Sequence, residues 1–225
     1  MNLNEAKKIL MDTSEKIKQS VSVEMEKRIF SYETFGKEIE VSVQNLIIEV
    51  FEQVGHKEIR KAKDKNEFPD LTITLSDGLL AIDIKAGNHY KKGDCCWKRC
   101  NNSENDLGTI RSWPEKLNKF GGDNIYYVFI EYSISDKLHQ IETVRIDPFY
   151  KFLDINSKGL LKYRKKDGNL RPKDFGVQSK IDSVSQFNSL LTITTIERAK
   201  SIIQEHIETI PKEQRNAFLN ELKTD

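Results

Sequence analysis

Three charged side chains, Asp70, Asp83 and Lys85, stand in a pattern that could support metal-dependent hydrolysis. Residues two positions apart on a strand point to the same face, so Asp83 and Lys85 are expected to share one face. Two carboxylates at close quarters repel each other, and a divalent cation such as Mg²⁺ removes that penalty while leaving room for water and a phosphate oxygen. A lysine beside them can orient an attacking water or stabilise the transition state.

The segment that carries these three residues is predicted to be a β-hairpin. Apolar residues alternate with threonine over 71–75, residues 76–78 read Ser-Asp-Gly, and 79–84 form a second, mostly apolar strand. In an antiparallel pair the start of one strand lies beside the end of the other, so the three charged groups should converge. The alternative is an ordinary hairpin in which Lys85 forms a salt bridge with one of the two aspartates.

The rest of the chain predicts helices and further strands around this hairpin. Helices are expected over 3–29, 36–54, 109–119, 183–190, 195–209 and 211–222, strands over 125–132 and 140–147, a possible short strand within 56–67, a long polar loop over 86–108, and a basic hairpin over 159–171. We therefore predict one α/β domain over 1–225, with a mixed central β-sheet flanked by helices and insertions near 86–108 and 158–175.

The composition restricts the class of protein. The chain has 225 residues, of which 37% are hydrophobic and 32% charged, with a net charge of +1. No apolar run approaches the roughly 18 residues of a membrane helix, and the N-terminus lacks a signal-peptide core, so we expect a cytoplasmic protein. Three cysteines, Cys95, Cys96 and Cys100, indicate a reducing compartment, and their spacing fits a zinc site poorly.

Pro69-Asp70 together with Asp83-Ile84-Lys85 resembles the signature of the PD-(D/E)xK nuclease superfamily, and within it the active-site hairpin of type II restriction endonucleases of the EcoRV kind. This resemblance implies a restriction-endonuclease-like core and a site-specific deoxyribonuclease that cuts double-stranded DNA at a short palindrome and leaves 5′-phosphate ends. The cofactor would be Mg²⁺, for which Mn²⁺ can substitute. Asp70 and Asp83 would bind the metal, and Lys85 would position the nucleophile.

In the same family a helix before the hairpin supplies another acid near the metal. Alignment of the helix ends at Gly55 assigns that catalytic and metal-binding position to Glu40, which borders the apolar stripe of its helix. The alternative is that Glu40 is a plain surface glutamate among several others.

Two basic segments could contact DNA phosphates or base edges. Asn169 is a candidate reader of adenine and Arg171 of guanine, although a solvated charged hairpin would have the same composition. The full set of candidate DNA-binding residues is Lys91, Lys92, Lys98, Arg99, Arg164, Lys165, Lys166, Asn169, Arg171 and Lys173.

The resemblance also implies partners: double-stranded DNA, a second copy of the chain in a homodimer, and a cognate DNA methyltransferase. The N-terminal helix could lie at the dimer interface or pack on its own domain. Three other functions stay open: a DNA-repair or junction nuclease with the same core, a duplex-DNA-binding protein that does not cleave, and a protein unrelated to DNA whose hairpin matches by coincidence.

Overall fold

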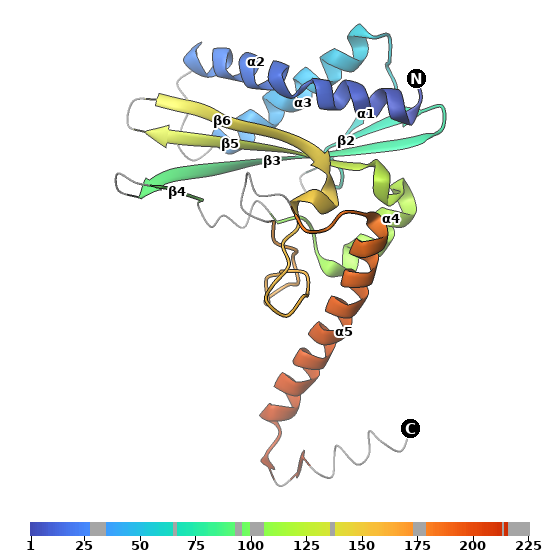
Figure 1. Ribbon diagram of the computed structural model, residues 1–225, viewed down its shortest axis with the longest axis vertical. Coiled ribbons are helices and arrows are strands. Elements are labelled where there is room, and N and C mark those ends of the chain that lie inside the picture. Colours follow the sequence, from blue (N-terminus) through green and yellow to red (C-terminus); the bar gives the residue numbers. More distant parts are fainter. Residues whose placement is uncertain are drawn as a thin grey trace.

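The computed structural model describes residues 1–27, 35–64, 67–92, 96–99, 106–135, 138–172, 179–212 and 214–215. A central sheet has α1, α2 and α3 on one face, whereas α4 and the long helix α5 lie on the other side (Figure 1). None of the helices within those ranges is long and apolar enough to cross a membrane.

The sheet is mixed, as predicted. Its strands run in the order β1-β2-β3-β5-β6, and β4 pairs with the far end of β3. β3 and β5 are parallel, whereas every other pair is antiparallel. The strands are β1 (Ile59–Lys61), β2 (Leu71–Leu75), β3 (Gly78–Lys92), β4 (Cys96–Arg99), β5 (Ile125–Ser135) and β6 (Leu138–Pro148). The predicted hairpin and the central position of its second strand are thereby confirmed, as is the short strand within 56–67.

The first core lies between the sheet and the three N-terminal helices, α1 (Leu3–Asp12), α2 (Ser14–Lys27) and α3 (Phe35–Gln53). Their apolar stripes are buried against strand residues such as Ile82 and Val128. The single helix expected over 3–29 is wrong, because the helix is interrupted at Thr13. The side chain of Thr13 donates a hydrogen bond to the Ile9 carbonyl oxygen at 2.6 Å. The stripe of α1 and α2 packs on its own sheet, which accounts for it without a dimer interface.

The second core lies on the opposite face and is rich in aromatic residues. The connection from β3 to β5 passes through η2 (Ile110–Ser112), α4 (Trp113–Phe120) and η3 (Gly122–Asn124), close to the predicted helix. Trp113 stacks on Phe149 of η4 (Phe149–Phe152), with 4.3 Å between ring centroids, and Phe187 meets both rings edge-on. These contacts anchor α4 and the start of α5 beneath the sheet.

The long polar loop predicted over 86–108 is wrong in its first part. β3 continues to Lys92, pairs in parallel with β5 up to His89, and pairs with β4 from there on. Pairing with two neighbouring strands holds this polar segment in an extended conformation. Its side chains do not alternate between polar and apolar, so the sequence alone does not predict a strand here.

The C-terminal region also differs from the prediction, because α5 (Val184–Thr209) is one helix instead of two. The stretch between the two predicted helices is itself helical, and the hydroxyls of Thr192 and Thr195 donate to the carbonyls of Asn188 and Leu191. Most of the helix predicted over 211–222 lies outside the described residues. In Figure 1, α5 projects away from the sheet.

Candidate active site

The candidate site lies where β2 and β3 part. Their pairing begins with Leu71 opposite Ile82, and β3 then continues beyond the start of β2. On that freed edge, the backbone N–H of Ile84 donates to Asp70 Oδ2 at 2.6 Å, and the N–H of Ala86 donates to Glu40 Oε1 at 3.1 Å. Two carboxylates from different elements therefore replace the bonds that a neighbouring strand would have made.

Glu40 belongs to α3 and lies beside its apolar stripe. Val43, Ile47 and Phe51 of that stripe are fully buried against the sheet, which brings the preceding turn of the helix to the edge of β3. The prediction that Glu40 borders the buried stripe is confirmed, and its hydrogen bond to Ala86 distinguishes it from the plain surface glutamate considered as the alternative.

Asp83 and Lys85 project from β3 toward the α4 side of the sheet. Ala81 belongs to the core on that side, and positions 83 and 85 follow it at the two-residue period of a strand. Lys85 Nζ lies 2.8 Å from Asp83 Oδ2, and the two side chains are only 20% and 7% exposed. This ion pair matches the ordinary salt-bridge interpretation, but it accounts for only one of the three acids that gather here.

The carboxyl groups of the site repel one another. Burial and the charge of Asp83 raise the pKa of Asp70 to about 6, although Lys85 and the Ile84 N–H act against the increase. Asp83 is thus close enough for its charge to favour the protonated form of Asp70, as the hairpin geometry predicts.

Burial and the neighbouring charges also shift the pKa values of Glu40 and Lys85. Burial raises the pKa of Glu40 to about 7, against the lowering effects of Lys85 and the Ala86 N–H. Burial lowers the pKa of Lys85, but the charges of Asp83, Asp70 and Glu40 more than offset this and hold it above its ordinary value. Three acids thus share one lysine, and the site carries an excess of negative charge.

This excess suits a hard divalent cation. Across the part of the chain that the structure describes, no three His, Cys, Asp or Glu side chains form a ready-made metal cluster. Mg²⁺, however, takes only one or two protein carboxylates and completes its octahedron with water and phosphate oxygens. Asp70 and Asp83 supply such oxygens near each other, and burial together with the charge of Asp83 raises the pKa of Asp70, a cost that a bound cation would offset. The residues present therefore fit Mg²⁺ or Mn²⁺.

The candidate DNA-binding residues between positions 91 and 99 form a first group, and those between 164 and 173 a second. The first group lies on paired strands instead of a loop. Lys91 and Lys92 end β3, and Lys98 and Arg99 end β4, with Lys91 opposite Trp97 and Lys92 opposite Cys96. Lys173 of the second group lies outside the described residues.

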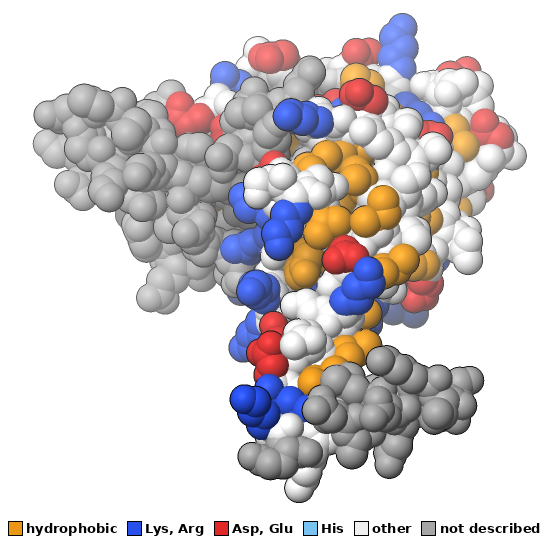
Figure 2. Space-filling view, turned by 60° about the horizontal axis from the view of Figure 1, so that its bottom comes forward, with side chains coloured by type: hydrophobic (Ala, Val, Ile, Leu, Met, Phe, Trp, Pro, Cys, Tyr) orange, Lys and Arg blue, Asp and Glu red, His pale blue; other side chains and the backbone are white. Residues whose placement is uncertain are grey.

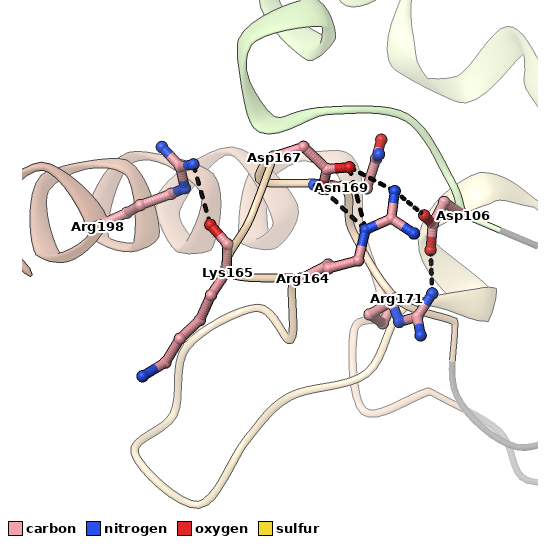
Figure 3. A network of polar contacts seen from close by, with 7 residues as sticks. All are labelled: Asp106, Arg164, Lys165, Asp167, Asn169, Arg171 and Arg198. Atoms are coloured by element: carbon pink, nitrogen blue, oxygen red, sulfur yellow. Dashed lines mark hydrogen bonds and ion pairs between the residues drawn. The ribbon is translucent and has the colours of Figure 1, made fainter. Parts of the chain in front are cut away.

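The basic hairpin of the second group is held by an acid that sequence reasoning missed. Asp106, 7% exposed, forms ion pairs with both Arg164 and Arg171, and Arg164 also pairs with Asp167 (Figure 3). The backbone N–H of Asn169 donates to Asp167 Oδ1 at 3.1 Å. Both arginines therefore fasten the hairpin in the free protein, so Arg171 would have to leave Asp106 to read a guanine.

The lysines of this hairpin are differently placed. Lys165 and Lys166 are exposed, and the Lys165 carbonyl oxygen accepts a hydrogen bond from Arg198 of α5 at 3.4 Å. Figure 2 turns the side of the molecule from which α5 projects toward the viewer. On this side, Lys and Arg side chains gather along one edge, beside exposed hydrophobic side chains. Of the candidate DNA-binding residues described in this hairpin, Lys165 and Lys166 are the exposed ones.

One further cation lies on the α4 side of the site. Lys116 is half-buried, and its ammonium feels the charges of Asp83 and Lys85. Its position could have been suspected from the sequence, because it lies in the helix predicted over 109–119, one helical turn before the apolar Phe120 that follows that range. Asp106 gave no such signal, since its partners lie 58 and 65 residues away in the chain.

The fold is mixed α/β with a restriction-endonuclease-like core. The solved structure of the NlaIV restriction endonuclease is similar, with a TM-score of 0.54 and 12% sequence identity; the match covers 74% of this chain and 66% of that one, just under two thirds. No protein-family model and no curated protein matches the sequence. The comparison supports the restriction-endonuclease-like fold in general, and the closer resemblance to the EcoRV kind stays a prediction.

Proposed function

We propose that this protein is a type II restriction endonuclease: a Mg²⁺-dependent, site-specific deoxyribonuclease that cuts double-stranded DNA at a short palindrome and leaves 5′-phosphate ends. One observation carries the proposal. Glu40 of α3, Asp70 just before β2, and Asp83 and Lys85 of β3 lie together where β2 and β3 part. The restriction-endonuclease-like fold supports it.

Each residue has a distinct task in this proposal. Asp70 and Asp83, with Glu40 beside them, would hold Mg²⁺ through carboxylate oxygens. When bound, the metal would lower the pKa of a water molecule and offset negative charge on the phosphate. Lys85, kept protonated by the surrounding acids, donates hydrogen bonds and would orient the attacking water. Backbone N–H groups of β3 hold Asp70 and Glu40 in place before the substrate arrives.

The remaining assignments follow from the same proposal. Lys165 and Lys166 would bind DNA phosphates, with the ends of β3 and β4 as a second basic surface. A palindromic site calls for two copies of the chain, one for each half-site. A cognate methyltransferase would protect host DNA, and both proteins would work in the cytoplasm. The short motif also supports a relation to the EcoRV kind of enzyme.

The test is cleavage of long unmethylated duplex DNA by the purified protein, in Mg²⁺ and in EDTA. The variant Lys85→Met keeps the length of the side chain and removes its charge, and Lys57→Met, at an exposed position, is the matched control. Discrete fragments that require Mg²⁺, persist in Lys57→Met and disappear in Lys85→Met are expected. Cleavage confined to branched DNA would replace the proposal with a junction nuclease, and metal-independent binding without cleavage would replace it with a DNA-binding protein.

A further inference from the structure

The face of β3 from which Asp83 and Lys85 project is covered by α4. Lys116 and Phe120 stand one turn apart on this helix, and both contact Phe68. Lys116 Nζ lies 3.7 Å from the centroid of the Phe68 ring, and the rings of Phe68 and Phe120 meet edge-on at 6.0 Å. Phe68 stands two residues before Asp70, so these contacts bring the Lys116 ammonium to the same place as the catalytic hairpin.

The Lys116 ammonium is enclosed on several sides. The Trp113 ring centroid lies 5.0 Å from Nζ, and a Cβ atom added to Gly108 would stand only 2.6 Å away, so the bare backbone of Gly108 closes another side. Aromatic faces attract the charged form of an amine. A glycine at 108 therefore makes room for this ammonium beside the two rings.

The Lys116 ammonium is not part of an ion pair with any residue that the structure describes. Throughout the ranges that the structure describes, Lys116 Nζ has no hydrogen-bond acceptor or ion-pair partner; its described contacts are the aromatic rings. Burial lowers the pKa of Lys116 to about 8, since the charge of Asp83 offsets only part of that effect and Lys85 adds to it. A half-buried ammonium without a counter-charge is costly, and a bound anion would supply what it lacks.

We propose that Lys116 is a second lysine of the active site, which binds an oxygen of the DNA phosphate held at Asp70 and Asp83. This inference rests on the nuclease function proposed above. The aromatic rings and Gly108 hold the ammonium, and its remaining N–H groups can donate to the phosphate. Lys85 from β3 and Lys116 from α4 would then approach one phosphate from two separate elements.

The test is single-turnover cleavage by Lys116→Met, with Lys119→Met as a control on the same helix. Lys119 is exposed, and its Nζ lies over the Phe120 ring at 5.1 Å, so it matches the change in charge and helix context. The rate constant of Lys116→Met is expected to fall about 100- to 1000-fold, as for loss of one preorganised donor to a transition state. The rate constant of Lys119→Met should stay within about twofold of wild type.

A second readout separates phosphate binding from a structural role. DNA binding is measured in Ca²⁺, which supports binding without requiring turnover. The slope of log affinity against log salt concentration should be shallower in Lys116→Met, by the amount expected for about one phosphate contact. A methylphosphonate at the cleaved position should weaken binding by wild type more than binding by Lys116→Met. Thermal melting should not fall, because the substitution removes an unpaired charge; if Lys116→Met does unfold, Lys116→Gln is measured in the same assays.

The outcomes are distinguishable. If wild-type protein does not cut DNA, the proposed function fails, and this inference fails with it. If wild type cuts and Lys116→Met equals Lys119→Met in rate and salt dependence, the inference fails while the nuclease function stands. A slower variant with an unchanged salt dependence and an unchanged methylphosphonate effect would also overturn the inference, since it would assign Lys116 a purely structural role.

Discussion

Asp70→Asn is expected to stabilise the metal-free protein while abolishing cleavage. The pKa of Asp70 rises from 3.8 to about 6 in the folded state, chiefly through burial. The folded protein therefore holds the proton more tightly than the unfolded chain, so wild-type stability falls as pH rises from about 4 to about 6. Above about pH 6 the whole of this loss of stability is present, and below about pH 4 none of it is.

The size of this effect follows from the pKa. One unit is equivalent to about 1.4 kcal/mol, so the ionised Asp70 costs the folded state at most about 3 kcal/mol. Asp70 is half-buried and partly screened by water, so a gain of about 1–3 kcal/mol is expected for Asp70→Asn at pH 8. The amide oxygen of asparagine can still accept the hydrogen bond from the Ile84 N–H, which an alanine would lose.

The measurement is urea unfolding in EDTA at pH 8 and at pH 4, with the exposed substitution Asp12→Asn as the control. Asp70→Asn should be more stable than wild type at pH 8 and equal to it at pH 4. Added Mg²⁺ should then stabilise wild type, by about 2.7 kcal/mol at 100 times its dissociation constant, and leave Asp70→Asn unchanged. A lower stability of Asp70→Asn at pH 8, or an equal gain at both pH values, would refute the reasoning.

Two further predictions concern the acids. If Glu40 and Asp70 bind Mg²⁺ as proposed, they have to lose protons whose pKa values are about 7 and about 6, so kcat/KM should climb steeply from pH 5 to pH 8. A flat profile in a direct cleavage assay would contradict this. Asp106→Asn removes the charge that Arg164 and Arg171 share, and should cost about 1–3 kcal/mol of stability by urea unfolding. Arg171 would then be released from Asp106, whereas Arg164 keeps its ion pair with Asp167, so the salt dependence of nonspecific DNA binding in fluorescence anisotropy should steepen; an unaltered slope would count against that.

The hairpin could be predicted because its signals are local. Alternating apolar residues, a Ser-Asp-Gly turn and a second apolar run specify both strands within a short segment, and the positions of Asp70, Asp83 and Lys85 follow from strand geometry. The strand predicted over 125–132 has equally local signals, its aromatic and β-branched residues, and it corresponds to β5, whose Tyr126, Phe129 and Tyr132 are buried.

The missed features depend on contacts between distant segments. β3 extends to Lys92 because β5 and β4 pair with it, and its own polar side chains give no sign of this. α5 stays continuous because Thr194 is fully buried and its hydroxyl accepts a hydrogen bond from the Leu161 N–H at 3.0 Å, which fixes the helix to the basic hairpin. Asp106 likewise acquires its role only through two arginines far along the chain.

The bonds from Ile84 and Ala86 to Asp70 and Glu40 also protect an exposed strand edge. A strand with free N–H groups is a template on which another molecule can add a strand and begin to aggregate. Here two charged side chains occupy those groups, and the charge itself discourages a second strand. Alanine at either position would reopen the edge, whereas asparagine or glutamine would keep it closed. The amide variants are therefore the ones expected to stay monodisperse at the concentrations that crystallisation with uncut DNA requires.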